Sequence, residues 1–189
     1  MSFLDVLLGR SKPKPARLDA LFAVSGAAVG LEAALGLRPT GRAGVCFKPA
    51  SGMGFESASQ ELRQLLELAV REGGGNLEIS DDRYGYRWVV LDDPDLEDLV
   101  TSIHLVNATL EDKGFGPLLL CSVFAFGDGE RACYLVYLYK RGTFYPFAPG
   151  AGQRRDNELE LQVRGALAED LSIEPDLTRW MALWGLPLS

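Results

Sequence analysis

The sequence predicts an α+β fold, in which an antiparallel sheet carries its helices mainly on one face. From residue 55 onward the hydrophobic periodicity follows the order α-ββ-α-βββ-α. Short polar turns join neighbouring strands, which parallel strands do not allow. Each predicted helix has one apolar stripe and therefore covers a sheet on one side only. We expect two parts, an N-terminal segment (1–17) and a single α+β domain (18–189).

A short helix and a hairpin are predicted ahead of this core. Residues 18–22 carry apolar side chains at helical spacing. Residues 27–37 are compatible with either a helix or a strand, because their alanines favour a helix while the interspersed glycines weaken it. We favour a hairpin there. A turn at 38–41 then leads into a strand at 44–48.

The next elements have clearer periodicity. Residues 57–71 have an apolar stripe of period 3.6 and predict a helix. A β-hairpin follows, with strands at 76–80 and 86–91 around a polar turn at 81–85. The helix predicted at 95–110 has the best-defined apolar face of the chain.

The second half predicts the centre of the sheet. Strands at 118–126 and 131–140 are apolar on both faces, which is typical of central strands. They are joined through Asp128-Gly129, a dipeptide that favours a two-residue type I′ turn. Three elements complete the chain: a strand at 143–147, a helix at 156–170 and a last short helix from residue 175.

Composition and charge narrow the class of function. Hydrophobic residues make up 47% of the chain and charged residues 24%, as in ordinary globular proteins. No apolar run approaches the ~20 residues that cross a bilayer, and the start does not resemble a secretory signal. The net charge of −7 argues against nucleic-acid binding, because phosphate attraction needs a basic surface. We therefore expect a cytoplasmic protein.

The residue types that commonly act in catalysis or bind metals are not spaced here as they are in the common catalytic or metal-binding motifs. Cys46, Cys121 and Cys133 form no CxxC pair and, with His104, supply no evident zinc site. We interpret the cysteines as buried small hydrophobic residues, with a redox switch as the alternative. The acidic run at 92–98 suits the helix that begins there better than it suits a cation site. We predict no catalytic residue, no metal ligand and no cofactor.

The most unusual passage combines aromatic and basic side chains. Aromatic residues and arginine are enriched in protein interfaces, so we predict a partner-binding site. The structural alternative is that the rings pack on the sheet while the arginines neutralise nearby acids. A second hypothesis is an unfamiliar enzyme or small-ligand site in the polar cluster at 154–160. The candidate partner-binding residues are Phe144, Tyr145, Phe147, Arg154 and Arg155.

The first 17 residues differ from the rest in charge. Four basic residues against one acidic residue give +3, which leaves −10 for the remainder. Apolar residues share one face of about two helical turns ahead of the basic residues, which favours contact with an anionic membrane. Docking onto the domain or disorder is the alternative. The candidate membrane-contact residues are Phe3, Leu4, Leu7, Leu8, Arg10, Lys12 and Lys14.

Several passages resemble the phage-shock-protein-A-associated B family (PspAB-like). They include YGYRWVVLDDPDLEDLV (84–100), HLVNATLEDKGFG (104–116), YKRGTFYPFAPG (139–150), RRDNELEL (154–161) and EPDLTRWMALWGLPL (174–188). The opening MSFLDVLLGR and RPTGRAGVCFKP (38–49) are similar to the family as well.

The resemblance implies a bacterial or archaeal protein of the envelope-stress response. Its implied partners are phage shock protein A and a membrane protease of the HtpX type, and it implies no catalytic residues. The element order also resembles type III secretion chaperone-like folds, although fold alone assigns no function. We therefore expect a non-enzymatic interaction or adaptor protein at the membrane face of the cytosol, of undetermined oligomeric state.

Overall fold

A computed structural model describes residues 18–50 and 75–188, together with positions 52, 54, 56, 57, 60, 61, 63, 64 and 67. The N-terminal segment (1–17), with all candidate membrane-contact residues, lies outside the described residues. Most of the helix predicted at 57–71 does so too.

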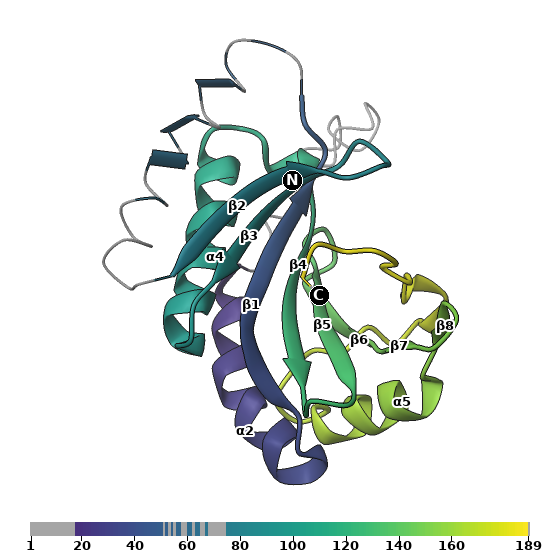
Figure 1. Cartoon of the computed structure of the whole chain (residues 1–189). Coiled ribbons are helices and arrows are strands. Elements are labelled where there is room, and N and C mark those ends of the chain that lie inside the picture. The colour runs from purple at the N-terminus through teal and green to yellow at the C-terminus, as the bar shows by residue number, and fades with distance from the viewer. Residues whose placement is uncertain are drawn as a thin grey trace, which may run out of the picture.

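A six-stranded antiparallel sheet, ordered β2-β3-β1-β4-β5-β6, forms the centre of the molecule (Figure 1). This arrangement confirms the predicted α+β class. A second, two-stranded sheet joins the short strands β7 and β8. The strands are β1 (Arg38–Phe47), β2 (Asn76–Asp81), β3 (Arg87–Asp92), β4 (Leu119–Gly127), β5 (Ala132–Leu138), β6 (Thr143–Phe147), β7 (Pro149–Gly150) and β8 (Arg154–Arg155).

The three described α-helices cover one face of the large sheet. Their apolar side chains and the inward side chains of the strands form one buried cluster. In Figure 1, α2 and α4 lie side by side behind the strands. The helical elements are η1 (Leu18–Phe22), α2 (Ala23–Leu35), α4 (Leu96–Asp112), η2 (Gly116–Leu118), α5 (Asn157–Ala166) and η3 (Leu177–Arg179).

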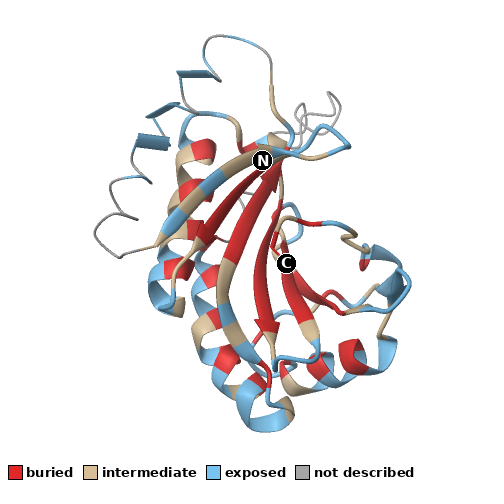
Figure 2. Ribbon diagram, in the orientation of Figure 1, coloured by how far each residue is buried: buried red, intermediate tan, exposed pale blue. Residues whose placement is uncertain are grey.

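The second face of the sheet is also buried, but irregular chain covers it. Many strand side chains point away from the helices on this face. Trp180, Leu186 and Leu188 of the C-terminal segment pack against them and form a separate apolar cluster. The central strands are consequently buried along most of their length (Figure 2). Burial on both faces explains why β4 and β5 are mostly apolar rather than alternating between apolar and polar residues.

The hairpin favoured at 27–37 is wrong, because most of this stretch is helical and belongs to α2. Its glycines have specific places in the helix. A Cβ atom at Gly30 would lie 3.4 Å from Asp170 Oδ2, so glycine leaves room for the segment after α5. Gly36 ends the helix in the left-handed region at φ 71°, and its N–H donates to the Glu32 carbonyl.

The turn predicted at 38–41 is wrong as well, because β1 already begins at Arg38. The pairing with β4 shifts register between Pro39 and Ala43, which marks a bulge rather than a turn. Gly41 lies at φ 79°, and a Cβ atom there would lie 2.9 Å from the Asp93 carbonyl oxygen. The strand can bend at this point because the residue is glycine.

The link between β4 and β5 is longer than the predicted two-residue turn. It spans Asp128 to Arg131, and only Gly129 has a positive φ, whereas a type I′ turn needs two such residues. The Asp128 carboxylate accepts hydrogen bonds from the N–H groups of Glu130 and Arg131 at 3.0 and 2.7 Å. This side chain, rather than a tight turn, closes the loop.

The last predicted helix reduces to the short turn η3. The Trp180 indole N–H donates to the Glu174 carbonyl at 3.0 Å, which directs the ring onto the sheet. Beyond it the chain runs without helical structure to Leu188. The spacing of the apolar residues therefore reflects a segment laid over a sheet, not a helix face.

One helical stretch, Leu18–Leu35, is long and apolar enough to cross a membrane by length and composition alone. Its mean hydropathy of 1.6 departs from the expectation that the chain holds no such segment. Leu21, Val24 and Leu31 on this stretch are buried in the cluster beneath the sheet. A helix that packs on a protein core meets the same criterion.

Candidate functional site

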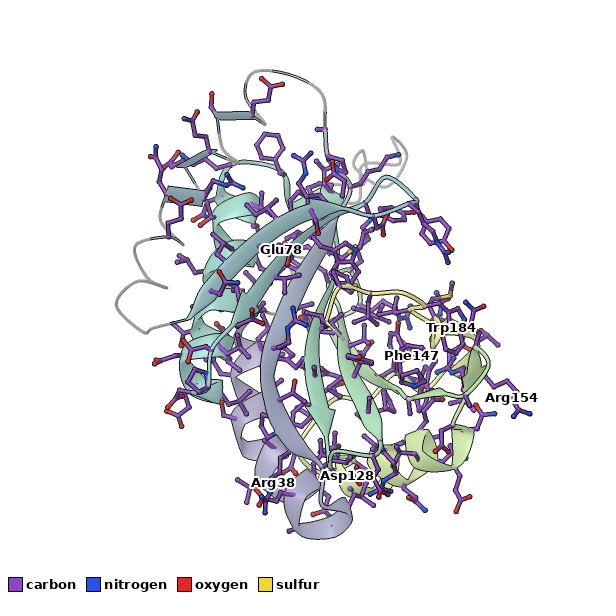
Figure 3. All side chains as sticks on the ribbon, in the orientation of Figure 1. Arg38, Glu78, Asp128, Phe147, Arg154 and Trp184 are labelled. Atoms are coloured by element: carbon purple, nitrogen blue, oxygen red, sulfur yellow. The ribbon has the colours of Figure 1, made fainter. Side chains whose placement is uncertain are left out.

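The three candidate aromatic residues lie in β6 and are each about 1% exposed. Phe144 packs on the helix side, with its ring centroid 4.9 Å from that of Tyr137. Tyr145 and Phe147 face the other side, where Phe147 meets Trp184 edge-on at 5.0 Å (Figure 3). The structure corrects the expectation that these rings are presented on the surface, and their role in binding stays a prediction.

The two candidate arginines have different environments. Arg155 Nε lies 2.8 and 3.1 Å from the two carboxylate oxygens of buried Glu160, and its guanidinium lies 5.6 Å from the Phe147 ring centroid. Arg155 Nη1 also donates to the Trp180 carbonyl. Arg154 is exposed and points away from the fold (Figure 3). Of the pair, only Arg154 offers its charge to the surroundings.

The polar cluster at 154–160 does not converge on a cavity. Asp156 caps α5, accepting a hydrogen bond from the Leu159 N–H at 3.0 Å. Glu158 is exposed, and Glu160 is held by Arg155 and by the Ala148 N–H. This arrangement counts against the small-ligand site predicted there, because capping and ion pairing already occupy these carboxylates.

A cavity of about 710 Å³ opens on the second face of the sheet. Its floor is a row of residues in direct cross-strand register, one from each of five neighbouring strands. The floor residues are Ser80, Trp88, Cys46, Cys121 and Leu138.

Aromatic and apolar side chains form the walls of this cavity. Tyr84 and Tyr86 lie on the turn between β2 and β3, and residues 181–187 of the C-terminal segment also line the cavity. Tyr84 is 66% exposed and Met181 is 61% exposed. The cavity therefore has an exposed aromatic and thioether rim, and the three central residues of its floor are buried.

Polar groups of the cavity wall form hydrogen bonds within the protein that hold the wall in position. The Asp82 carboxylate accepts hydrogen bonds from the N–H groups of Tyr84 (2.8 Å) and Tyr86 (2.9 Å) and from the Trp88 indole (3.2 Å). The Tyr145 hydroxyl donates to the Met181 carbonyl at 3.1 Å. Burial raises the pKa of Tyr145, so this hydroxyl stays protonated and remains a donor.

A buried carboxylate, Glu174, anchors the segment that leads into wall residues 181–187. Glu174 is 0% exposed and accepts hydrogen bonds from the Arg141 guanidinium, the Thr143 hydroxyl (2.9 Å) and the Asp176 N–H (3.2 Å). The hydrogen bond from Arg141 is the largest cause of the lowered pKa of Glu174. The backbone of residues 172–174 also pairs with Phe144. The segment that precedes the cavity wall is therefore held to β6 and to the connection between β5 and β6.

Sequence reasoning missed the cavity because its lining comes from six strands, the β2–β3 turn and the C-terminal segment. One signal was present, since Tyr86 and Trp88 alternate on the same face of the predicted hairpin. The prediction that the acidic run belongs to a helix start is confirmed, because α4 begins at Leu96 with Glu97 and Asp98 in its first turn. The structure adds that Asp95 caps this helix, accepting hydrogen bonds from the Glu97 and Asp98 N–H groups. Within the described residues, no three metal-ligating side chains come together.

The three cysteines are buried and free, as predicted for small hydrophobic residues. His104 lies at the border of the α4 core face, with its ring centroid 4.9 Å from that of Phe22. These placements show no nucleophile paired with a base.

A sequence model of the family described as PspA associated protein B matches residues 1–188, nearly the whole chain. The match confirms the resemblance carried by the sequence passages. No curated protein and no solved structure matches the chain. The likeness to type III secretion chaperone-like folds therefore stays a prediction.

Proposed function

This chain belongs to the PspA associated protein B family, and on that premise we propose that it is a non-enzymatic adaptor that binds PspA. The family description supports an association with PspA in the phage shock response. The observation that carries a binding role is the apolar cavity with its exposed aromatic rim.

The chemistry of the cavity suits an apolar side chain of a protein partner. Binding energy at interfaces concentrates in aromatic residues that surround well-packed pockets. Tyr84, Tyr86 and Met181 place such groups around a floor that contains Trp88. The hydrogen bonds to Asp82 hold the tyrosine turn in place before a partner arrives, which lowers the entropy cost of binding.

The pairing of the charged groups supports binding rather than turnover. Glu160 and Glu174 are buried against Arg155 and Arg141, and each closes a contact between segments of the fold. A general base needs a free lone pair within reach of a substrate. The carboxylate oxygens of Glu160 and Glu174 instead accept hydrogen bonds from other parts of the fold.

The proposal places the protein at the cytoplasmic face of the membrane. Its support is the charge of residues 1–17, because each cation near an anionic surface adds about 1 kcal/mol. If this segment is the contact, binding to anionic vesicles falls with salt and disappears when residues 1–17 are deleted. A protease of the HtpX type is the second partner that the resemblance implies.

Affinity capture tests the proposed function. Immobilised full-length chain should retain PspA, and the double variant Tyr84→Ala/Met181→Ala should weaken binding at least about tenfold, or 1.4 kcal/mol. Val29→Ala is the matched control, because Val29 is an exposed apolar residue of α2 on the helix side. Arg154→Ala tests the arginine predicted from the sequence.

Equal retention by the wild type and the double variant would remove the cavity from the proposal. No retention of PspA by the wild type would remove the adaptor role itself. Adding an HtpX-type protease to the same capture tests the second partner.

The cavity volume favours a second candidate function, the binding of an apolar small molecule. Ligand sites in proteins commonly enclose about 300–1,000 Å³, and this cavity falls within that range. Native mass spectrometry of the purified chain is the test. A bound mass that organic extraction removes, and that Ala182→Trp displaces, supports this function, whereas bare protein at every step counts against it.

A further inference from the structure

Two of the five residues on the cavity floor are cysteines that face each other across neighbouring strands. Cys46 of β1 and Cys121 of β4 are direct partners in the antiparallel register. Directly opposite Cα atoms in such a ladder lie about 4.5–5.5 Å apart. A disulfide spans Cα separations of about 4.4–6.8 Å, so the register places both residues within bridging distance.

The side chains of both cysteines belong to the apolar cluster on the second face of the sheet. Both line the same cavity. Cys46 is 5% exposed and Cys121 is 8% exposed, and neither is in a disulfide. The cavity gives small reagents a route to these sulfur atoms.

Cys133 provides an internal contrast. It lies in the other apolar cluster, on the helix-covered face of the sheet, and does not line the cavity. Its distance from the cavity makes it a built-in control for the pair on the floor.

The local backbone supports a change at this position. The β1–β4 ladder shifts register immediately after Cys46, between Cys46 and Phe47. A bulge of this kind increases local twist and re-aims side chains. Small rotations that bring two sulfur atoms into bonding geometry are easier beside a bulge than inside a regular ladder.

We propose that Cys46 and Cys121 form a redox-active dithiol that closes reversibly to a cross-strand disulfide on the floor of the cavity. The oxidant is a small disulfide that enters the cavity. One cysteine thiolate attacks a sulfur of the small disulfide, which forms a mixed disulfide and releases one small thiol. The second cysteine thiolate attacks the protein sulfur of that mixed disulfide and releases the second small thiol.

The exchange is balanced. The protein loses two electrons and two protons, and the small disulfide gains both as it becomes two thiols. The neighbouring Cys121 thiol, together with burial, raises the pKa of Cys46, so few thiolates are present at neutral pH. We therefore expect closure over minutes to hours without a catalyst.

Closure ties β1 to β4 next to Trp88 in the same cross-strand row and converts both floor thiols to a disulfide. A bond at this point connects residues far apart in the chain and restricts the unfolded state. The oxidation state of a bacterial cytoplasm would then set the shape and rigidity of the cavity floor. This inference does not depend on PspA being the partner.

Peptide mapping of the full chain tests the proposal. The protein is equilibrated with oxidised glutathione, its remaining thiols are alkylated after denaturation, and the digest is analysed by mass spectrometry. We expect one peptide pair linked through Cys46 and Cys121, with the loss of two hydrogen atoms and reversal by dithiothreitol. Cys133 should be alkylated.

Matched variants sharpen the outcome. Cys133→Ala should leave the linked pair unchanged, whereas Cys46→Ser and Cys121→Ser should each abolish it. Circular dichroism confirms that each variant is folded, and mapping of the wild type decides the question even if a variant is not. Full alkylation of both cysteines after equilibration, or a link through Cys133 or between chains, would overturn the proposal.

Discussion

Asn107 of α4 and Ser122 of β4 are joined by a buried hydrogen bond, with Asn107 Nδ2 2.9 Å from Ser122 Oγ. The same amide group donates to the Ile103 carbonyl at 2.8 Å. In a face otherwise packed with apolar side chains, this bond specifies how the helix sits on the sheet. A partner removed from such a bond leaves the other group unsatisfied.

Replacement of Asn107 by alanine should therefore destabilise the fold. The Ser122 hydroxyl loses its partner and a small cavity opens, so we expect the free energy of unfolding to fall by about 1–3 kcal/mol. Urea denaturation followed by circular dichroism measures the change. Thr101→Ala, at an exposed position of the same helix, is the control and should stay within about 0.5 kcal/mol of the wild type.

Arg155 and Arg154 should differ sharply when each is replaced by alanine. Arg155→Ala leaves Glu160 buried without its charge partner and should cost about 3–5 kcal/mol of unfolding free energy. Arg154→Ala removes an exposed charge and should cost less than about 0.5 kcal/mol. Similar losses for the two variants in urea denaturation would refute the assignment of Arg155 as a structural link.

The stability of the fold should depend on pH through Glu174. Its folded-state pKa is lowered by Arg141, so the unfolded state binds the proton more readily. The stabilisation is complete above the usual value of 4.5 and is lost as the pH falls through the lower folded value.

Glu174→Gln should be less stable than the wild type at pH 7, and the difference should shrink as the pH falls below 4.5. Unfolding free energies measured from pH 3 to pH 7 test this. Glu169→Gln, at an exposed position, should follow the wild-type profile. A constant gap between Glu174→Gln and the wild type would show that ionisation of this group is not the cause.

Two glycine substitutions should have opposite effects. Gly26 lies inside α2 with nothing within 4 Å of a Cβ atom, so Gly26→Ala should stabilise the protein by about 0.5–1 kcal/mol. Gly41→Ala should destabilise it by at least about 1 kcal/mol, because the residue has a positive φ and a close carbonyl neighbour. Thermal denaturation midpoints should move in opposite directions, and a shared direction would contradict the backbone assignment.

Much of the fold was predictable because its signals are local. The stripe on residues 95–110 and the alternation of Tyr86 and Trp88 each reflect contact with one apolar layer, which a short window reveals. Asp95 and Asp156 were readable as helix starts for the same reason, since a cap needs only its own next residues.

The candidate site was less predictable. The sequence suggested that the aromatic side chains of Phe144, Tyr145 and Phe147 are exposed. All three are buried, because the sheet that carries them is covered on both faces. Gly30 weakens a helix in isolation, but the approach of the segment after α5 makes a small residue suitable there. Such compensation comes from distant parts of the chain and leaves no local pattern.

The sequence by itself determined the α+β class, the order of most elements from residue 76 onward and the family of this protein. These follow from periodicity, turn chemistry and matched passages, all of which are properties of neighbouring residues. Only the tertiary structure decided that Cys46 is paired with Cys121 and that the C-terminal segment forms a wall of the cavity that both cysteines line. Strand register and the covering of a sheet face join residues remote in sequence, so their physical cause, packing across the fold, appears only when the chain is folded.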